Sequence, residues 1–143
     1  MGIGLQEDAN ATPAEKPMSI EDVYLWGSEF PPPSGAEKFL GEEAEGSPVG
    51  KIRGILEGYS DDFVTTEPVG SFGADTNGLY DLSGNVWELA ADWRDDAKEK
   101  VSMRGGAWNR NKPVDFLSSY RYSSVPDSAG TGIIGLRVVF AED

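Results

Sequence analysis

The feature that most constrains this chain is a glycine-bent, oxygen-rich loop that runs directly into an alternating segment, Asn77-Gly-Leu-Tyr-Asp-Leu-Ser-Gly-Asn-Val-Trp-Glu-Leu-Ala-Ala-Asp-Trp93. Its glycines allow the backbone to turn back and present its own carbonyl groups. Oxygen-bearing side chains follow at short spacings, at Asp81, Ser83, Asn85 and Glu88. Carboxylate, amide and carbonyl oxygens are the ligands that calcium prefers. A polar turn, in which Asp and Asn bond their own backbone, explains the same residues, so both interpretations stay open here.

Hydrophobic periodicity places the expected strands in the second half of the chain. Residues 86–93 alternate with period two, which predicts a strand with Trp87, Leu89, Ala91 and Trp93 on one face. A second strand is expected within residues 98–104, before the Gly105-Gly106 bend. The strongest pattern covers residues 133–140, where Ile134, Leu136, Val138 and Phe140 point the same way. No long helix is predicted, and the acidic run 41–50 indicates a solvated loop.

Composition limits the chemistry that these 143 residues can perform, because they include no Cys and no His. Thiolate nucleophiles, disulfides and the commonest transition-metal ligand are therefore missing. The net charge of −13 argues against nucleic acid and anionic membrane surfaces as partners. No apolar run approaches the roughly 20 residues of a membrane span. The first ten residues do not show a signal peptide pattern, and the sequence identifies no compartment.

The order of several short motifs resembles the sulfatase-modifying-factor, or formylglycine-generating-enzyme, family. Besides the opening segment, the motifs are Tyr24-Leu-Trp-Gly27, Pro68-Val-Gly-Ser-Phe72, Met103-Arg-Gly-Gly-Ala-Trp-Asn109, Val125-Pro-Asp127 and Ile134-Gly-Leu-Arg-Val-Val139. The likeness runs from about Tyr24 to Phe140. It implies an α+β, C-type-lectin-like fold that is loop-rich with short antiparallel strands. The family's first half, with an early strand pair and a helix, has no counterpart here, so the chain resembles the C-terminal half of such a domain.

The resemblance assigns calcium to the opening loop. The implied ligands are the side chains of Asp81 and Glu88 and the carbonyls of Gly84 and Val86, with Asn85 bracing the loop. A second family site would use Asp61 and the Phe63 carbonyl, but Lys38 stands where an Asn is usual. An ammonium cannot ligate a cation, although it can replace one as a fixed charge. A mobile surface lysine is the alternative.

The resemblance also locates the family's catalytic cysteines, which this chain lacks. Counting back from the stretch 121–127 puts Pro113 and Ser118 at the two Cys positions. Neither can hold copper, and the family's other chemistry, iron bound by His, has no His to use. We therefore expect calcium but neither copper nor iron, and no catalytic residues.

Aromatic and basic residues supply the remaining expectations. The four tryptophans are expected mainly as core anchors. Arg104, Arg121 and Arg137 should pair with carboxylates, with Asp92, Asp127 and Glu88 as candidate partners. Related variable proteins display ligand-contacting loops in the region that here contains Trp108, Asn109, Tyr120 and Tyr122, which makes these a candidate ligand surface.

These observations predict a weakly structured lead-in over residues 1–20 and a domain portion over residues 21–143. The leading hypothesis is a non-catalytic, calcium-stabilised binding or structural module. Two alternatives stay open: a truncated member of the enzyme family whose activity needs the missing half, and a diversified ligand-display protein. Self-association is expected if the sheet is uncovered, unless residues 1–20 cover it.

Overall fold

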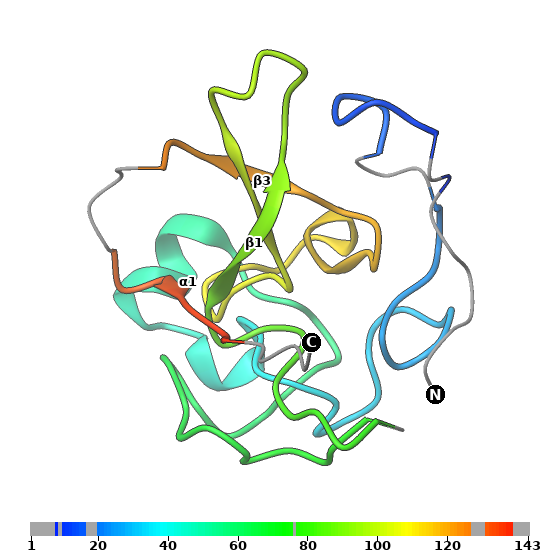
Figure 1. Ribbon diagram of the computed structural model, residues 1–143. Helices are drawn as coiled ribbons and strands as arrows, with labels where there is room; N and C mark the ends of the chain where they lie inside the picture. The colour runs from blue at the N-terminus through cyan, green and yellow to red at the C-terminus, as the bar shows by residue number, and fades with distance from the viewer. Residues whose placement is uncertain (1–7, 9, 17–19, 76, 127–130, 139–143) are drawn as a thin grey trace.

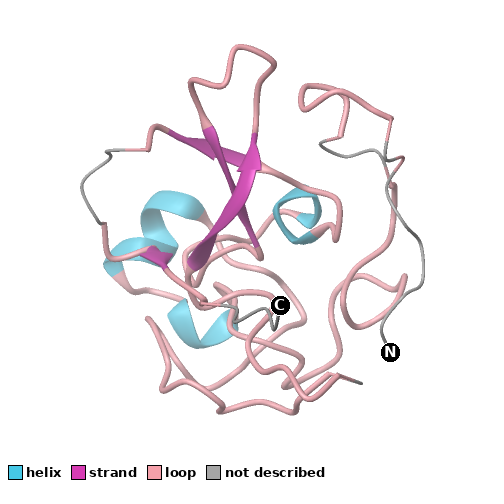
Figure 2. Cartoon of the chain, viewed as in Figure 1, coloured by secondary structure: helices cyan, strands magenta, loops and turns pink. Residues whose placement is uncertain are grey.

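A four-stranded mixed sheet organises the second half of the chain (Figures 1 and 2). The computed structural model describes residues 8, 10–16, 20–75, 77–126 and 131–138. The strands are β1 (Trp87–Trp93), β2 (Val101–Arg104), β3 (Tyr122–Ser124) and β4 (Ile134–Gly135), in the order β3-β2-β1-β4. β1 pairs antiparallel with β2 and parallel with β4, and β2 pairs antiparallel with β3.

The β1–β2 hairpin confirms the two strands predicted from residues 86–104. Leu89 lies opposite Met103, and Trp93 lies opposite Val101, with an irregularity in the register between them. β2 ends at Arg104, because Gly105 and Gly106 both take positive φ and turn the chain out of the ladder.

The helices are short, as the sequence predicted, and they are η1 (Glu42–Ala44), α1 (Pro48–Arg53) and η2 (Pro113–Phe116). However, η1 lies within the run 41–50 that was expected to be loop, and α1 begins in it. Ser47 caps α1, since its Oγ accepts a hydrogen bond from the Gly50 amide at 3.0 Å. The Ser-Pro start is the local signal for this helix, and the acidic composition of residues 41–50 obscured it.

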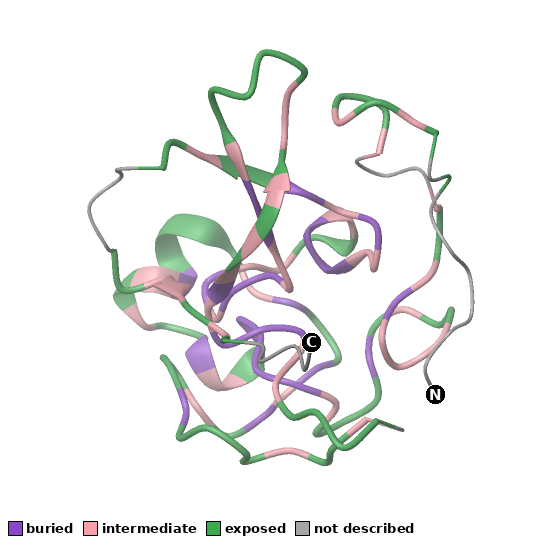
Figure 3. Cartoon of the chain, viewed as in Figure 1, coloured by how far each residue is buried: buried purple, intermediate pink, exposed green. Residues whose placement is uncertain are grey.

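Two apolar clusters form the core of the described residues, and buried segments run through the loops between the helices and the sheet (Figure 3). The first joins rings from distant segments, with Phe39 and Phe116 centroids 4.2 Å apart. Its buried members are Tyr24, Phe39, Leu56, Tyr59 and Phe116. The second lies on the sheet and consists of Trp87, Met103 and Ala107.

The strand pattern predicted for residues 133–140 is only partly right. Within the described residues the strand is Ile134–Gly135, and residues 139–140 lie outside them. Leu136 and Val138 are 72% and 64% exposed, so the apolar face predicted for this segment is uncovered in the described residues. The apolar face predicted for β1 is also only partly covered. Trp87 is fully buried, whereas Leu89 and Trp93 are 36% and 38% exposed. Periodicity identified the alternation but could not show whether anything packs on that face.

The lead-in is only partly described, and within its described residues Ile20 is attached to a distant segment. There the backbone N–H donates to Ser119 Oγ at 3.2 Å, and that hydroxyl donates back to the Ile20 carbonyl at 3.0 Å. Earlier, the Glu15 carboxylate accepts from both the Thr12 N–H and the Thr12 hydroxyl at 2.9 Å, which forms a turn and not a helix. Among the described residues, no helix has the length and apolarity to cross a bilayer.

Candidate cation-binding loop and cavity

The loop before β1 owes its tight path to residues in the left-handed region of backbone space, three of which lie within residues 81–85. Asp81, Gly84 and Asn85 have φ values of 53°, 81° and 51°. Gly84 also lies so close to the backbone of Lys38 that an added Cβ would be 2.1 Å from the Lys38 carbonyl oxygen. Only glycine fits this position, and the close approach anchors the loop to residues 38–39.

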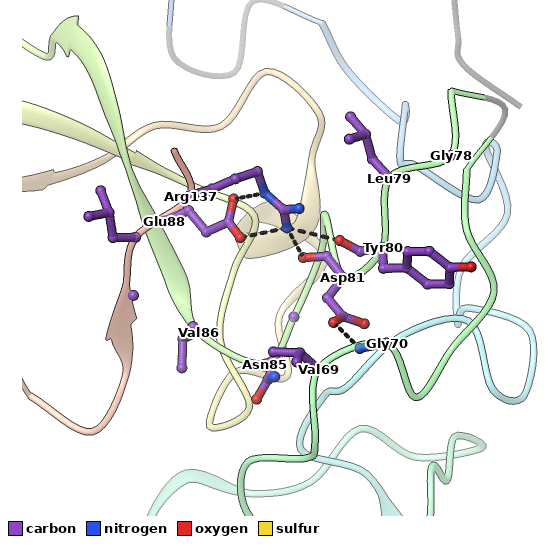
Figure 4. A pocket seen from close by; sticks show the side chains of 13 residues that line it. Val69, Gly70, Gly78, Leu79, Tyr80, Asp81, Asn85, Val86, Glu88 and Arg137 are labelled. Carbon is purple, nitrogen blue, oxygen red and sulfur yellow. Dashed lines mark hydrogen bonds and ion pairs between the residues drawn. The ribbon is translucent and has the colours of Figure 1, made fainter. Parts of the chain in front are cut away.

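This loop forms one wall of a cavity of about 590 Å³, and Figure 4 shows how its side chains lie. Gly70, Tyr80 and Arg137 contribute other parts of the lining. The structure brings all four predicted calcium-ligating positions to this cavity: Asp81, Gly84, Val86 and Glu88.

Arg137 holds the carboxylate of Glu88 in a two-point ion pair. Its Nε and Nη2 donate to the two Glu88 oxygens at 2.8 and 2.6 Å. The same Nη2 donates to the carbonyls of Tyr80 and Asp81 at 2.8 and 3.1 Å. These hydrogen bonds to Glu88 raise the pKa of Arg137 above its usual value. The sequence analysis predicted this Arg137–Glu88 pairing. A cation can therefore bind Glu88 only if Arg137 shares or releases the carboxylate.

The carboxylate of Asp81 points away from Glu88 toward the Gly70 loop (Figure 4). Its Oδ2 accepts a hydrogen bond from the Gly70 amide at 2.6 Å. Its Oδ1 is buried and has no hydrogen-bond partner among the described residues. A buried carboxylate oxygen without a donor fits a cation ligand, because desolvation without compensation is unfavourable.

Asn85 braces the loop, as expected. Its Oδ1 accepts from the Glu67 amide, and its Nδ2 donates to the Glu67 carbonyl, both at 3.3 Å. Its backbone N–H donates to the Lys38 carbonyl at 3.0 Å.

Two buried carboxylates near this loop were missed by the sequence analysis. Burial, followed by the charges of Asp81 and Glu67, raises the pKa of Glu37 to about 8. Burial, followed by the charges of Asp81 and Asp61, raises the pKa of Glu67 to about 7. Neither side-chain oxygen of Glu67 has a hydrogen-bond partner among the described residues. Their positions in polar loop sequence gave no sign of burial.

The second candidate metal site contains a lysine. The Lys38 side chain is fully buried, and its Nζ lies 2.9 Å from Asp61 Oδ1. The surface-lysine alternative is therefore wrong. Phe63, whose carbonyl the resemblance assigned to this site, instead donates its N–H to Asp61 Oδ1 at 3.0 Å.

The two positions where the resemblance places cysteines lie at η2 and just after it. Pro113 begins this helix, and Ser118 follows it. The Ser118 amide donates to the Val23 carbonyl at 2.8 Å, and its own carbonyl accepts from Arg104 Nη2 at 2.8 Å. In this chain the segment makes structural hydrogen bonds to residues distant in sequence.

The candidate ligand surface is divided by the structure. Asn109 is 7% exposed, whereas Tyr122 is 36% exposed and stacks on Trp87 with ring centroids 5.2 Å apart. Tyr120 packs on the same indole. Trp108 Nε1 donates to the Gly132 carbonyl at 3.0 Å. Of these four residues, only Tyr122 is exposed; Trp108 and Tyr120 are half-buried and Asn109 is buried.

Arg121 supplies a second confirmed pairing. Its Nε donates to Asp92 Oδ2 at 3.0 Å, and the arginine is 4% exposed. This contact ties the turn before β3 to β1. Asp127, the third candidate partner, lies outside the described residues.

These features define a loop-rich α+β domain built on a small mixed sheet, with a cavity beside β1 whose lining includes the carboxylates of Asp81 and Glu88. The chain belongs to the sulfatase-modifying factor enzyme 1-like domain family, which it matches over residues 19–142. It is also similar to PvdO from Pseudomonas aeruginosa, with 33% sequence identity over 54% of this chain and a TM-score of 0.47. The match covers 34% of the PvdO chain, so this chain spans about a third of that protein's length.

Proposed function

We propose that this chain is a non-catalytic, calcium-stabilised binding or structural module with the C-type-lectin-like variant of its family's fold. The ion would be held by Asp81 and Glu88 together with the carbonyls of Gly84 and Val86. The supporting observation is that these four positions line one cavity, where Asp81 Oδ1 is buried and without a donor in the described part of the chain. An ion there would neutralise Asp81 and share Glu88 with Arg137, which would draw the loop toward β1.

The non-catalytic part of the proposal rests on composition. The 143 residues contain neither Cys nor His, so they offer no thiolate for copper and no imidazole for iron. Pro113 and Ser118 stand at the positions where the family resemblance places the catalytic thiols.

Thermal melting in chelator and in excess calcium tests the proposal. Calcium that binds only the folded chain at 100 times its dissociation constant would stabilise it by about 2.7 kcal/mol. Equal melting midpoints in the two solutions would remove the ion from this account.

Two variants separate ligand loss from loss of the Glu88–Arg137 ion pair. Glu88→Gln removes both a proposed ligand and the ion pair, so it should abolish the response to calcium. Arg137→Gln breaks the same ion pair but leaves the ligand, so it should keep or strengthen the response. A calcium response that survives in Glu88→Gln and disappears in Arg137→Gln would contradict the assignment.

A further inference from the structure

Lys38 places a full positive charge inside a buried stretch of chain. Residues 37–41 are all buried, and the Lys38 side chain is fully buried, as are Phe39 and Leu40 beside it. An ammonium group so far from water is tolerated only where oxygen atoms replace its hydration shell.

The three N–H donors of this ammonium are all accounted for by oxygen atoms. One partner is the Asp61 carboxylate, whose two oxygens lie 2.9 and 3.0 Å from Nζ. The second is Glu43 Oε1 at 3.4 Å, and the third is the carbonyl of Phe39. A lysine ammonium has three donors and no acceptor, so this set satisfies it completely.

The carboxylate of Asp61 is equally saturated. Besides Lys38, its Oδ2 accepts from the Phe39 amide at 2.8 Å, and its Oδ1 accepts from the Phe63 amide at 3.0 Å. These donors use the roughly four lone-pair positions that a carboxylate offers. An external cation could bind Asp61 only by displacing the ammonium.

The backbone of Lys38 connects this cluster to the cavity loop. Its carbonyl accepts from the Asn85 amide at 3.0 Å, and residue 38 forms a parallel bridge with Gly84. One residue therefore fixes Asp61 through its side chain and the turn before β1 through its main chain.

We propose that the Lys38 ammonium is the built-in cation of an oxygen-lined site formed by Asp61, Glu43 and the Phe39 carbonyl. The family resemblance implies a metal ion near Asp61, and the residues present do not fit one while Lys38 is in place. The chain carries its own positive charge there, so this anchor is insensitive to chelators and to calcium. Removal of the ammonium should open the site to a hard divalent cation, because every remaining group is an oxygen donor.

The test uses chains that also carry Asp81→Asn and Glu88→Gln, so that the cavity loop contributes no calcium response. In this background, the chain that keeps Lys38 should have the same melting temperature in chelator and in calcium. Lys38→Ala should melt roughly 10–20 °C lower in chelator, because two carboxylates lose their buried partner. It should recover roughly half of this loss in about 10 mM calcium.

A size-matched variant separates the charge of Lys38 from its volume. Lys38→Met removes the charge but fills the space, so it should be destabilised without recovery in calcium. Lys38→Ala with Asp61→Asn should also show no recovery, since Asp61 supplies two of the oxygens. If Lys38→Ala does not fold in chelator, refolding with and without calcium provides the same comparison.

Two results would overturn the inference. A calcium response with Lys38 intact in this background would show that the site accepts a metal beside the ammonium. Absence of calcium recovery in Lys38→Ala, by melting or by refolding, would show that the oxygen atoms do not form a cation site. Both readouts are independent of the cavity loop, so they stand whether or not calcium binds there.

Discussion

Single carboxylates near the cavity loop are held in an environment that disfavours their charge. Glu67 is 7% exposed, and burial raises its pKa to about 7. A carboxyl group whose pKa is higher in the folded state than in the unfolded state binds its proton more tightly when folded. Its contribution to the free energy of unfolding is therefore fully present below the unfolded pKa and is lost as the pH rises through the folded pKa.

We predict that Glu67→Gln removes part of this pH dependence. Between pH 4.5 and about 7 the parent chain should lose stability that the variant keeps, so that above pH 7 Glu67→Gln is more stable by on the order of 1–3 kcal/mol. Urea denaturation in chelator at several pH values measures the difference. Glu57→Gln, at an exposed position, is the control and should follow the parent. Parallel pH curves for the parent and Glu67→Gln would show that Glu67 does not titrate in this range.

Gly84 is the residue on which the cavity loop depends most directly. Its positive φ and the 2.1 Å approach of an added Cβ to the Lys38 carbonyl both exclude a side chain. We predict that Gly84→Ala lowers the free energy of unfolding by about 2–4 kcal/mol. Gly73→Ala is the matched control, because an added Cβ there meets no atom within 4 Å, and it should change stability by less than about 0.5 kcal/mol. Equal effects of the two substitutions would rule out a special role for Gly84.

At the scale of elements, the sequence predicted what is local and missed what depends on distant packing. The alternation of residues 87–93 identified β1, and the paired glycines at 105–106 marked the end of β2. The same alternation put Leu136 and Val138 on one face of a strand, but the described strand ends at Gly135 and both side chains are exposed, because periodicity shows neither how far pairing extends nor what covers a face. Glu67 gave no sign of burial, and for Lys38 the sequence left a fixed buried charge and a surface side chain both open. The contacts that decide these positions are with Asn85 and Asp61, which are distant in sequence.

The exposed side of β1 and the segment after β4 form a hollow with exposed leucines that should attract a second copy of this chain. Leu89, Ala91 and Leu136 line a cavity of about 520 Å³ on this side, and Glu88, Arg104 and Arg137 supply charged groups to the same lining. β4 lies at the edge of the sheet, and an uncovered apolar edge favours association.

We predict that the chain self-associates through this hollow at micromolar concentrations. Leu89→Ser combined with Leu136→Ser should shift the population toward monomer in sedimentation velocity, with a small effect on stability because both side chains are already exposed. Ile52→Ser removes an apolar side chain that is 82% exposed on α1, so it serves as the control and should leave the association unchanged. A parent chain that sediments as a monomer across this range would disprove the prediction.

At the scale of the whole molecule, the described elements fall within the stretch that matches the family, and this stretch contains neither Cys nor His. The family match covers residues 19–142, and the sheet, the cavity loop and the arginine–carboxylate pairs all lie within it. Where the resemblance places thiols, Pro113 starts η2 and Ser118 bonds to Val23 and Arg104. These residues position backbone segments but provide no group that can bind copper or transfer electrons.

We therefore predict that the isolated chain does not convert the thiol of a Cys-x-Pro-x-Arg peptide to formylglycine, with or without added copper. Oxidation of that thiol requires an electron acceptor bound at the site, and without Cys or His this chain offers neither thiolate nor imidazole to hold a copper or iron ion. Mass spectrometry of the peptide after incubation measures the reaction, with an active enzyme of the family as the positive control and a reaction without protein as the blank. Loss of the thiol mass above the blank would show that the chain is catalytic by a route that uses neither group. Loss only after addition of a longer protein that contains the rest of the domain would support the alternative that this chain is one part of an enzyme.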